Sequence, residues 1–241
     1  IDITGNLDLN ADIGNTGGTA GAASLAVSGT TDLGADVTTV GTQTYGGITT
    51  VSVASTLATT NSNITFNNTI VGDGGADGLT LNMGSGIVEF NGAVGGTAIG
   101  AIAITGGLNL DAAITSATSL TVSTTSNLGA SVTTSGLQTY TQAVTLSAGN
   151  TLTSSGTGAL TFTAAVDSDS TARALITSTG GNTTFNAAVG GTAALSGLES
   201  TTAVFTAKAI KVGGTIDITN SATSTITGII SDGASAAALT K

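Results

Sequence analysis

The sequence predicts an all-β protein, folded as a parallel β-solenoid. Two observations support this fold: a long repeat of 95 residues, and a shorter repeat of about 19 residues nested inside it. Self-similarity at a fixed period is typical of arrays in which each structural unit occupies an equivalent environment. We therefore expect residues 1–241 to form a single continuous solenoid segment.

The long repeat is visible in two pairs of matching segments. EFNGAVGGTA at 89–98 returns as TFNAAVGGTA at 184–193, and DLGADVTTVGTQTY at 32–45 returns as NLGASVTTSGLQTY at 127–140. Both pairs have the same offset of 95 residues. The copies cover approximately residues 24–118 and 119–213, with partial copies at both ends.

The short repeat begins with Leu or an aromatic residue and has Val or Ile four places later, as in FNNTI at 66–70. Successive copies follow at unequal steps along the chain that average about 19 residues, and we expect each copy to correspond to one coil. In a solenoid, equivalent residues of neighbouring coils lie about 4.8 Å apart, so like residues stack on like. We predict an internal ladder of the Leu and aromatic positions, a second ladder of Val and Ile, and an amide ladder at a bend. The predicted aromatic ladder contains Tyr45, Phe66, Phe90, Tyr140, Phe162, Phe185 and Phe205, and the predicted amide ladder contains Asn67, Asn91 and Asn186.

Tandem immunoglobulin-like β-sandwiches are the alternative fold, because such domains are about 100 residues long. The chain has no Trp for a sandwich core and no Pro. In addition, the strands of a sandwich occupy different environments and have no reason to resemble one another. The repeated strands therefore favour the solenoid.

Composition excludes several classes of function. The chain has no Cys and no His, so it lacks thiolate chemistry and imidazole ligands for transition metals. Its formal net charge is −10, with four basic residues (Arg173, Lys208, Lys211 and Lys241). This charge argues against nucleic acid and anionic membranes as partners. The uncharged stretch 90–110 is interrupted by Gly, Thr and Asn and lacks flanking anchors, so we expect no membrane span.

The runs ITFNNTI, VEFNGAV and TTFNAAV, with GTQTY and GLQTY between them, resemble the repeats of bacterial surface adhesins of the filamentous-haemagglutinin type. The resemblance covers nearly the whole chain. It implies a right-handed parallel β-helix and an extracellular or cell-surface location. The secretion domain usual at the N-terminus of that family is not visible in this sequence.

Few residues suggest catalysis. Asp32 with Asp36, and Asp167 with Asp169, form candidate carboxylate pairs, but turn formation by Asp explains both. The two glutamates at 89 and 199 have no evident acidic partner, and we expect no catalytic residue and no cofactor.

Two ligand hypotheses arise from local patterns. Asp73 and Asp77 in GDGGADGLTLN partly match a calcium-binding nonapeptide, although such sites need tandem copies. Thr-containing runs at 37–39 and 132–134 suggest an ice-binding face, but the unequal steps between copies of the short repeat argue against register between the threonines.

These observations predict a non-enzymatic extracellular structural protein: the β-solenoid shaft of a bacterial surface adhesin, filament or sheath. Its expected partners are copies of itself or flanking repeats, stacked end to end, and the surface of a host or neighbouring cell. The alternative is a carbohydrate-binding or carbohydrate-cleaving β-helix protein. Exposure of Tyr45 or Tyr140 at a groove would favour that alternative.

Overall fold

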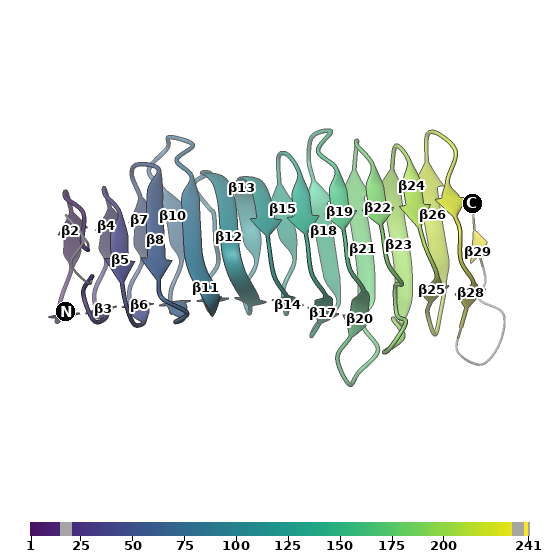
Figure 1. Ribbon diagram of the computed structural model, residues 1–241. Helices are drawn as coiled ribbons and strands as arrows, with labels where there is room; N and C mark the ends of the chain where they lie inside the picture. Colours follow the sequence, from purple (N-terminus) through teal and green to yellow (C-terminus); the bar gives the residue numbers. More distant parts are fainter. Residues whose placement is uncertain (15–20, 233–238, 241) are drawn as a thin grey trace. The chain divides into compact units, whose positions relative to one another are not determined.

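A computed structural model describes residues 1–14, 21–232 and 239–240. The chain divides into two compact units, unit 1 at Ile1–Ser123 and unit 2 at Thr124–Lys241. Within each unit the chain winds in successive coils, and each strand pairs in parallel with a strand of the next coil (Figure 1). The predicted fold class is confirmed: this is a parallel β-solenoid, consistent with a right-handed parallel β-helix.

Most of the strands are only three residues long. Unit 1 contains β1 (Asp2–Ile3), β2 (Leu7–Leu9), β3 (Leu25–Val27), β4 (Thr31–Leu33), β5 (Val37–Thr39), β6 (Gln43–Tyr45), β7 (Thr49–Val51), β8 (Ser55–Thr59), β9 (Ile64–Phe66), β10 (Ile70–Gly72), β11 (Leu79–Phe90), β12 (Ile99–Leu110) and β13 (Ile114–Val122). Unit 2 contains β14 (Ser126–Leu128), β15 (Val132–Thr134), β16 (Gln138–Tyr140), β17 (Val144–Leu146), β18 (Asn150–Ser154), β19 (Leu160–Phe162), β20 (Val166–Ser168), β21 (Ala174–Thr179), β22 (Thr183–Phe185), β23 (Gly197–Thr202), β24 (Phe205–Ala207), β25 (Ile210–Lys211), β26 (Ile216–Asn220), β27 (Thr225–Ile226), β28 (Ile230–Ser231) and β29 (Leu239–Thr240).

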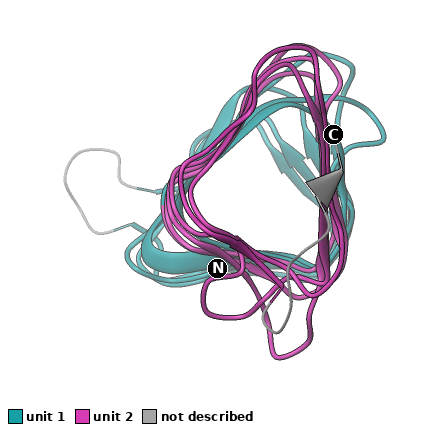
Figure 2. Cartoon of the chain, turned by 90° about the vertical axis from the view of Figure 1, so that its right-hand side faces the viewer, with its two compact units in different colours: residues 1–123 teal, residues 124–241 magenta. Residues whose placement is uncertain are grey.

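A coil of unit 1 has three strands separated by tight bends, which gives the three-sided outline of its coils in Figure 2. Strands β4, β5 and β6 of one coil pair with β7, β8 and β9 of the next. Residues that lie beside one another in successive coils form a column. The spacing between members of a column along the chain is unequal, as in the column Val27, Tyr45, Phe66, Phe90 and Leu110. Coils of unequal length therefore keep their strands in register.

Unit 2 repeats this arrangement. Strands β14, β15 and β16 pair with β17, β18 and β19, and the last of these pairs with β22. A particularly long step separates the partners Leu152 and Thr177. The additional residues lie in the bend between β20 and β21, which projects in Figure 1. In this part of unit 2 the bends absorb the variation in coil length.

The period-2 alternation of the sequence explains which side chains enter the interior. In β15, Val132 and Thr134 are buried while Thr133 faces outward, and most three-residue strands repeat this pattern. Backbone bonds then join the coils; for example, Thr49 N donates to Thr69 O at 2.9 Å. Val, Ile and Thr suit such strands because branched side chains pack well on a pleated surface.

The short repeat proves to be the sequence signature of a bend. Phe66 ends β9 and Ile70 begins β10, with three residues between them that turn the chain. Leu33 and Val37 bracket the bend between β4 and β5 in the same way. Each copy therefore supplies one inward side chain on each side of a bend.

The prediction of one ladder for all Leu and aromatic positions is wrong. Leu33 pairs with Leu9 and Val51, whereas Tyr45 pairs with Val27 and Phe66 in a different column. The physical reason is that a coil has several bends with the same packing requirement. One coil can therefore contain two copies of the motif.

The immunoglobulin-like alternative is also wrong, because the strands pair in parallel between successive coils and not antiparallel within two sheets. The continuity of a single solenoid over residues 1–241 stays a prediction.

Candidate functional site

The aromatic residues of unit 1 form an internal stack. The ring centroids of Tyr45 and Phe66 are 4.9 Å apart with an interplanar angle of 12°, and those of Phe66 and Phe90 are 5.6 Å apart at 35°. All three side chains are fully buried. The first pair is stacked and the second is tilted, and aromatic pairs of this kind contribute roughly 0.5–1.5 kcal/mol each beyond the burial of their surface. The stack therefore fixes the register of three coils.

Unit 2 contains a longer stack of four rings. Tyr140 and Phe162 are 5.1 Å apart at 7°, Phe162 and Phe185 are 4.6 Å apart at 7°, and Phe185 and Phe205 are 5.9 Å apart at 53°. These residues are buried as well. The two tyrosines, whose exposure would have favoured a carbohydrate groove, are each 0% exposed.

A buried glutamine binds the hydroxyl of each tyrosine. In unit 1, the Nε2 of Gln43 donates to Ala58 O at 2.8 Å and to Val37 O at 3.2 Å, and the Tyr45 hydroxyl donates to Gln43 Oε1 at 2.9 Å. The side chain thus bridges two strands of its own coil to the next coil. Burial raises the pKa of the Tyr45 phenol.

Unit 2 contains the same network 95 residues later. The Nε2 of Gln138 donates to Thr153 O at 2.9 Å and to Val132 O at 3.3 Å, and Tyr140 donates to Gln138 Oε1 at 3.1 Å. Burial likewise raises the pKa of Tyr140. Our sequence analysis missed both glutamines, although their repetition in the two QTY segments was a signal.

The Asn ladder is present in unit 1. Asn91 Nδ2 donates to Asn67 Oδ1 at 3.1 Å, and both residues are exposed at the same bend of successive coils. In unit 2, Asn186 is exposed at the bend after Phe185, and its backbone N–H donates to Phe162 O at 2.8 Å. These side chains serve the bends and do not form a pocket.

The first candidate carboxylate pair is used for bonds between coils. The Ser52 hydroxyl donates to Asp32 Oδ1 at 2.5 Å, and Thr56 N donates to Asp36 Oδ1 at 2.7 Å. Asp36 N in turn donates to Asp12 Oδ1 at 3.1 Å. Each carboxylate therefore accepts a hydrogen bond from a group of the following coil, and these bonds hold neighbouring coils together.

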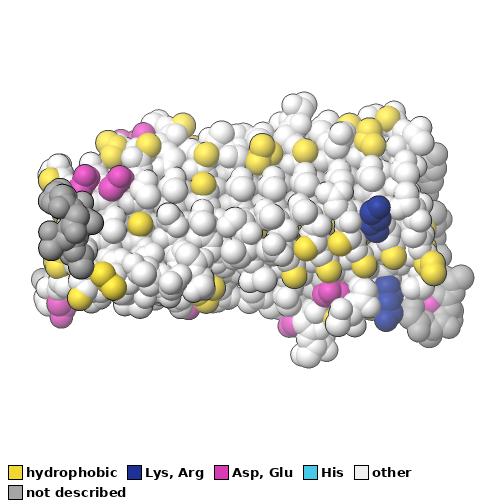
Figure 3. All heavy atoms as spheres, viewed as in Figure 1, with side chains coloured by type: hydrophobic (Ala, Val, Ile, Leu, Met, Phe, Trp, Pro, Cys, Tyr) yellow, Lys and Arg dark blue, Asp and Glu magenta, His cyan; other side chains and the backbone are white. Residues whose placement is uncertain are grey.

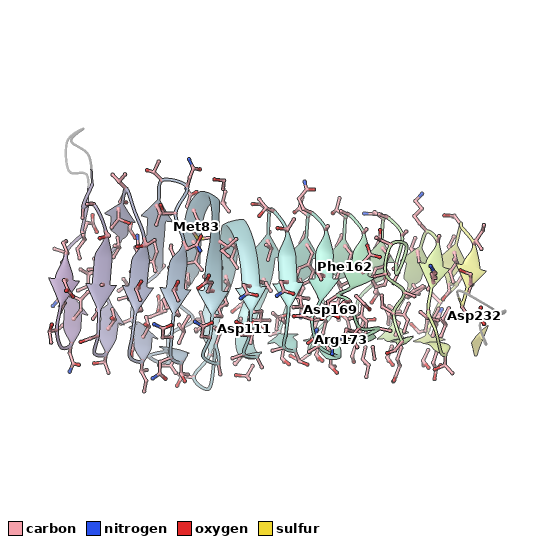
Figure 4. All side chains as sticks on the ribbon, turned by 90° about the horizontal axis from the view of Figure 1, so that it is seen from below. Met83, Asp111, Phe162, Asp169, Arg173 and Asp232 are labelled. Carbon is pink, nitrogen blue, oxygen red and sulfur yellow. The ribbon has the colours of Figure 1, made fainter. Side chains whose placement is uncertain are left out.

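The two members of the second candidate pair have different partners: Asp167 lies in β20, and Asp169 lies in the projecting bend that follows it. Asp167 Oδ1 accepts bonds from the backbone N–H groups of Thr192 at 2.9 Å and Ala193 at 3.1 Å. Asp169 forms a bidentate ion pair with Arg173, with Nη2 and Oδ2 at 2.8 Å (Figure 4). The hydrogen bonds from Arg173 lower the pKa of Asp169, and the same bonds raise the pKa of Arg173.

The calcium candidates Asp73 and Asp77 lie in the loop after β10. Asp73 Oδ1 accepts a bond from Gly75 N at 2.9 Å, which is the geometry of an Asx turn. Over the described residues, no three Asp or Glu side chains come close enough together to share a metal ion. The structure brings two carboxylates to this loop and supplies no third.

Glu89 also bonds to neighbouring coils. Its carboxylate accepts bonds from Thr65 Oγ1 at 3.1 Å and from Asn63 Nδ2 at 3.4 Å. The prediction that Glu199 has no acidic partner is wrong. It lies directly beside Asp217 in the register of β23 and β26, because the chain makes a short coil at that point.

Glu199 and Asp217 also line a shallow pocket of about 210 Å³, together with parts of β21, the start of β23 and Thr215 before β26. Both carboxylates are exposed. The pocket offers a concave surface with two acids on one side. It is a feature of unit 2 that could accommodate a small polar ligand.

The visible molecular surface carries few charged side chains, and its hydrophobic side chains are scattered (Figure 3). In the described part of the chain, no helix is long and apolar enough to cross a membrane. No protein-family model matches the chain, and neither curated proteins nor solved structures give a significant match. The resemblance to filamentous-haemagglutinin-type adhesins therefore stays a prediction, and what the structure supports is a β-solenoid repeat protein.

Proposed function

We propose that this chain is a non-enzymatic, extracellular structural segment: a β-solenoid shaft of a bacterial surface adhesin, filament or sheath. One observation carries the proposal. Three of the four candidate carboxylates, Asp32, Asp36 and Asp167, accept hydrogen bonds from the following coil. Their task is to hold a repeated backbone in register.

The interior supports a mechanical role in the same way. Stacked rings run through several coils of each unit, and each unit has one buried glutamine that bonds to the next coil, so these coils are joined by side chains as well as by backbone bonds. Solenoid coils contact mainly their neighbours, so such ties determine how strongly the array resists separation of coils. Rigidity is the property that a shaft requires.

The proposed partners are flanking repeats or further copies of the chain, stacked end to end. The bonds between coils run from backbone N–H to backbone C=O, as from Ile70 N to Ala93 O at 2.9 Å. Backbone pairing of this kind is open to any chain that presents a strand edge. The proposed location is the cell exterior.

Two measurements test the shaft proposal. Protease treatment and antibody labelling of intact producing cells should show the chain to be accessible outside the cell, and accessibility only after lysis would contradict the location. In single-molecule pulling, the wild-type chain should unfold in coil-sized steps at higher force than Phe162→Ala, with Thr161→Ala as the surface control. Equal forces for all three chains would contradict the mechanical role of the stack.

A carbohydrate-directed function is the second candidate, supported by the pocket beside Glu199 and Asp217. A glycan array and a reducing-sugar assay on the wild-type chain and Glu199→Gln test it, with Glu89→Gln as the matched control. Binding or cleavage that Glu199→Gln abolishes would favour this candidate over the shaft.

A further inference from the structure

One outward face of unit 2 carries threonines in register from coil to coil. Its first column runs through β16, β19, β22, β24 and β27, and the register of those strands places each threonine beside the next. This column consists of Thr139, Thr161, Thr184, Thr206 and Thr225. The uneven coil lengths that argued against such register are absorbed by the bends.

A second column lies two residues further along the chain, directly after the end of each strand. It consists of Thr141, Thr163, Asn186, Lys208 and Thr227. Backbone bonds from Thr163 N to Tyr140 O and from Asn186 N to Phe162 O, at 2.9 and 2.8 Å, show that the register continues past the strand ends. We call these ten residues the threonine face. Three of its five rows have the pattern Thr-x-Thr.

The hydroxyl groups of this face are available to a ligand. Several inward threonines of the same unit use theirs internally: for example, Thr134 donates to Gly136 O at 2.7 Å, and Thr202 donates to Gly181 O at 2.8 Å. The threonines of the threonine face make no side-chain hydrogen bond within the part of the chain that the structure describes. Each hydroxyl can both donate and accept.

The face is also regular and nearly uncharged. The coils of unit 2 overlie one another in Figure 2, so the face has little twist. Rows are separated by the strand spacing of about 4.8 Å, and the two columns by about 6.6 Å, the rise of two residues. Although the chain has a net charge of −10, Lys208 is the one charged residue among the ten.

We propose that the threonine face binds ice. A ligand that matches this face should itself be a neutral, periodic surface of hydrogen-bonding groups, as an ice surface is. In addition, the spacing between rows of the face is close to the short lattice repeat of hexagonal ice. The threonine methyl groups restrict the orientation of the water between the hydroxyls, so that water is ordered at lattice positions. A protein partner is less well matched, because binding to proteins is dominated by large aromatic and Arg anchors, which this face lacks. A sugar is also less well matched to this face, because sugar-binding surfaces generally use exposed aromatic rings, and the rings of unit 2 are buried.

Thermal hysteresis and inhibition of ice recrystallisation, measured on the whole 241-residue chain, test the proposal. The test variant, Thr161→Tyr with Thr184→Tyr, places two bulky rings on adjacent rows of the face. The matched control, Thr153→Tyr with Ser178→Tyr, changes two outward residues that are also register neighbours but lie on β18 and β21. Circular dichroism and the melting temperature establish that both variants retain the fold.

We expect the wild type and the control to show thermal hysteresis, and the folded test variant to lose it. Absence of ice activity in the folded wild type would overturn the proposal, as would retention of activity in the folded test variant. Equal loss in both variants would also overturn it. Sedimentation that shows self-association without ice activity, abolished by the test variant, would instead assign the face to a second copy of the chain.

Discussion

Replacement of Phe162 by Ala tests whether the ring stack holds unit 2 together. Phe162 is 1% exposed and lies between Tyr140 and Phe185, with centroid distances of 5.1 and 4.6 Å and near-parallel planes. Truncation of a core Phe to Ala costs roughly 3–5 kcal/mol. This substitution also removes two stacked pairs of about 0.5–1.5 kcal/mol each, which places its cost near the upper end, about 5 kcal/mol.

Phe205→Ala is the internal comparison. Phe205 is equally buried but has one ring partner, Phe185, at 5.9 Å and 53°. We expect its cost to be smaller than that of Phe162→Ala by about 0.5–1.5 kcal/mol, the contribution of one stacked pair. Phe162→Leu keeps most of the apolar volume and separates the loss of stacking from the loss of volume.

Urea unfolding followed by far-UV circular dichroism measures these differences. Since solenoid coils can unfold without the whole array, hydrogen exchange at the amides of β16, β19 and β22 should be followed in parallel. Exchange should accelerate most in those strands. A cost below about 1 kcal/mol for Phe162→Ala, or one no larger than that of Phe205→Ala, would refute the argument from stacking.

Three further predictions concern polar groups. Gln138→Leu should destabilise the chain by roughly 1–3 kcal/mol for each buried group that loses its partner, as urea unfolding will show against the outward control Thr139→Ala. Both tyrosines, whose ordinary pKa is 10.0, should stay protonated in the folded chain well above that pH, because burial raises their pKa. The unfolded chain then binds fewer protons, so stability should fall as pH rises above about 10, by about 1.4 kcal/mol per pH unit for each tyrosine, in urea titrations monitored by phenolate absorbance. Arg173→Gln should raise the pKa of Asp169 towards 3.8 in an NMR titration; because the folded pKa is lowered, the stability from this pair is present above that value and is lost as pH falls below it.

Each prediction has a result that would contradict it. An unchanged urea midpoint for Gln138→Leu would mean that the buried network contributes nothing. Phenolate absorbance that rises near pH 10 before any unfolding would show that the tyrosines are accessible to solvent. An Asp169 pKa that does not respond to Arg173→Gln would show that the ion pair does not persist in solution.

Part of the fold could be predicted from repetition alone. Copies such as FNNTI and FNGAV contain the same alternation, and equal sequences in a repeated array favour equal environments. The stacks of Tyr45 on Phe66 and of Phe162 on Phe185 follow from that principle. The position of Glu199 could not be predicted in this way. Asp217 lies beside it because of the length of the intervening coil, which the repeats do not specify.

The sequence by itself determined the solenoid class, the burial of its aromatic residues and the absence of imidazole and thiolate chemistry, because these depend on local alternation, repetition and composition. The tertiary structure alone decided which copies share a column, because pairing between coils depends on how many residues each bend takes up. For this reason Leu33 stacks on Leu9 and not on an aromatic ring, and Thr139 and Thr161 align across coils of unequal length. The number of residues between two repeat copies includes both strand and bend residues. Which residues lie beside one another in successive coils depends on the pairing of the strands alone.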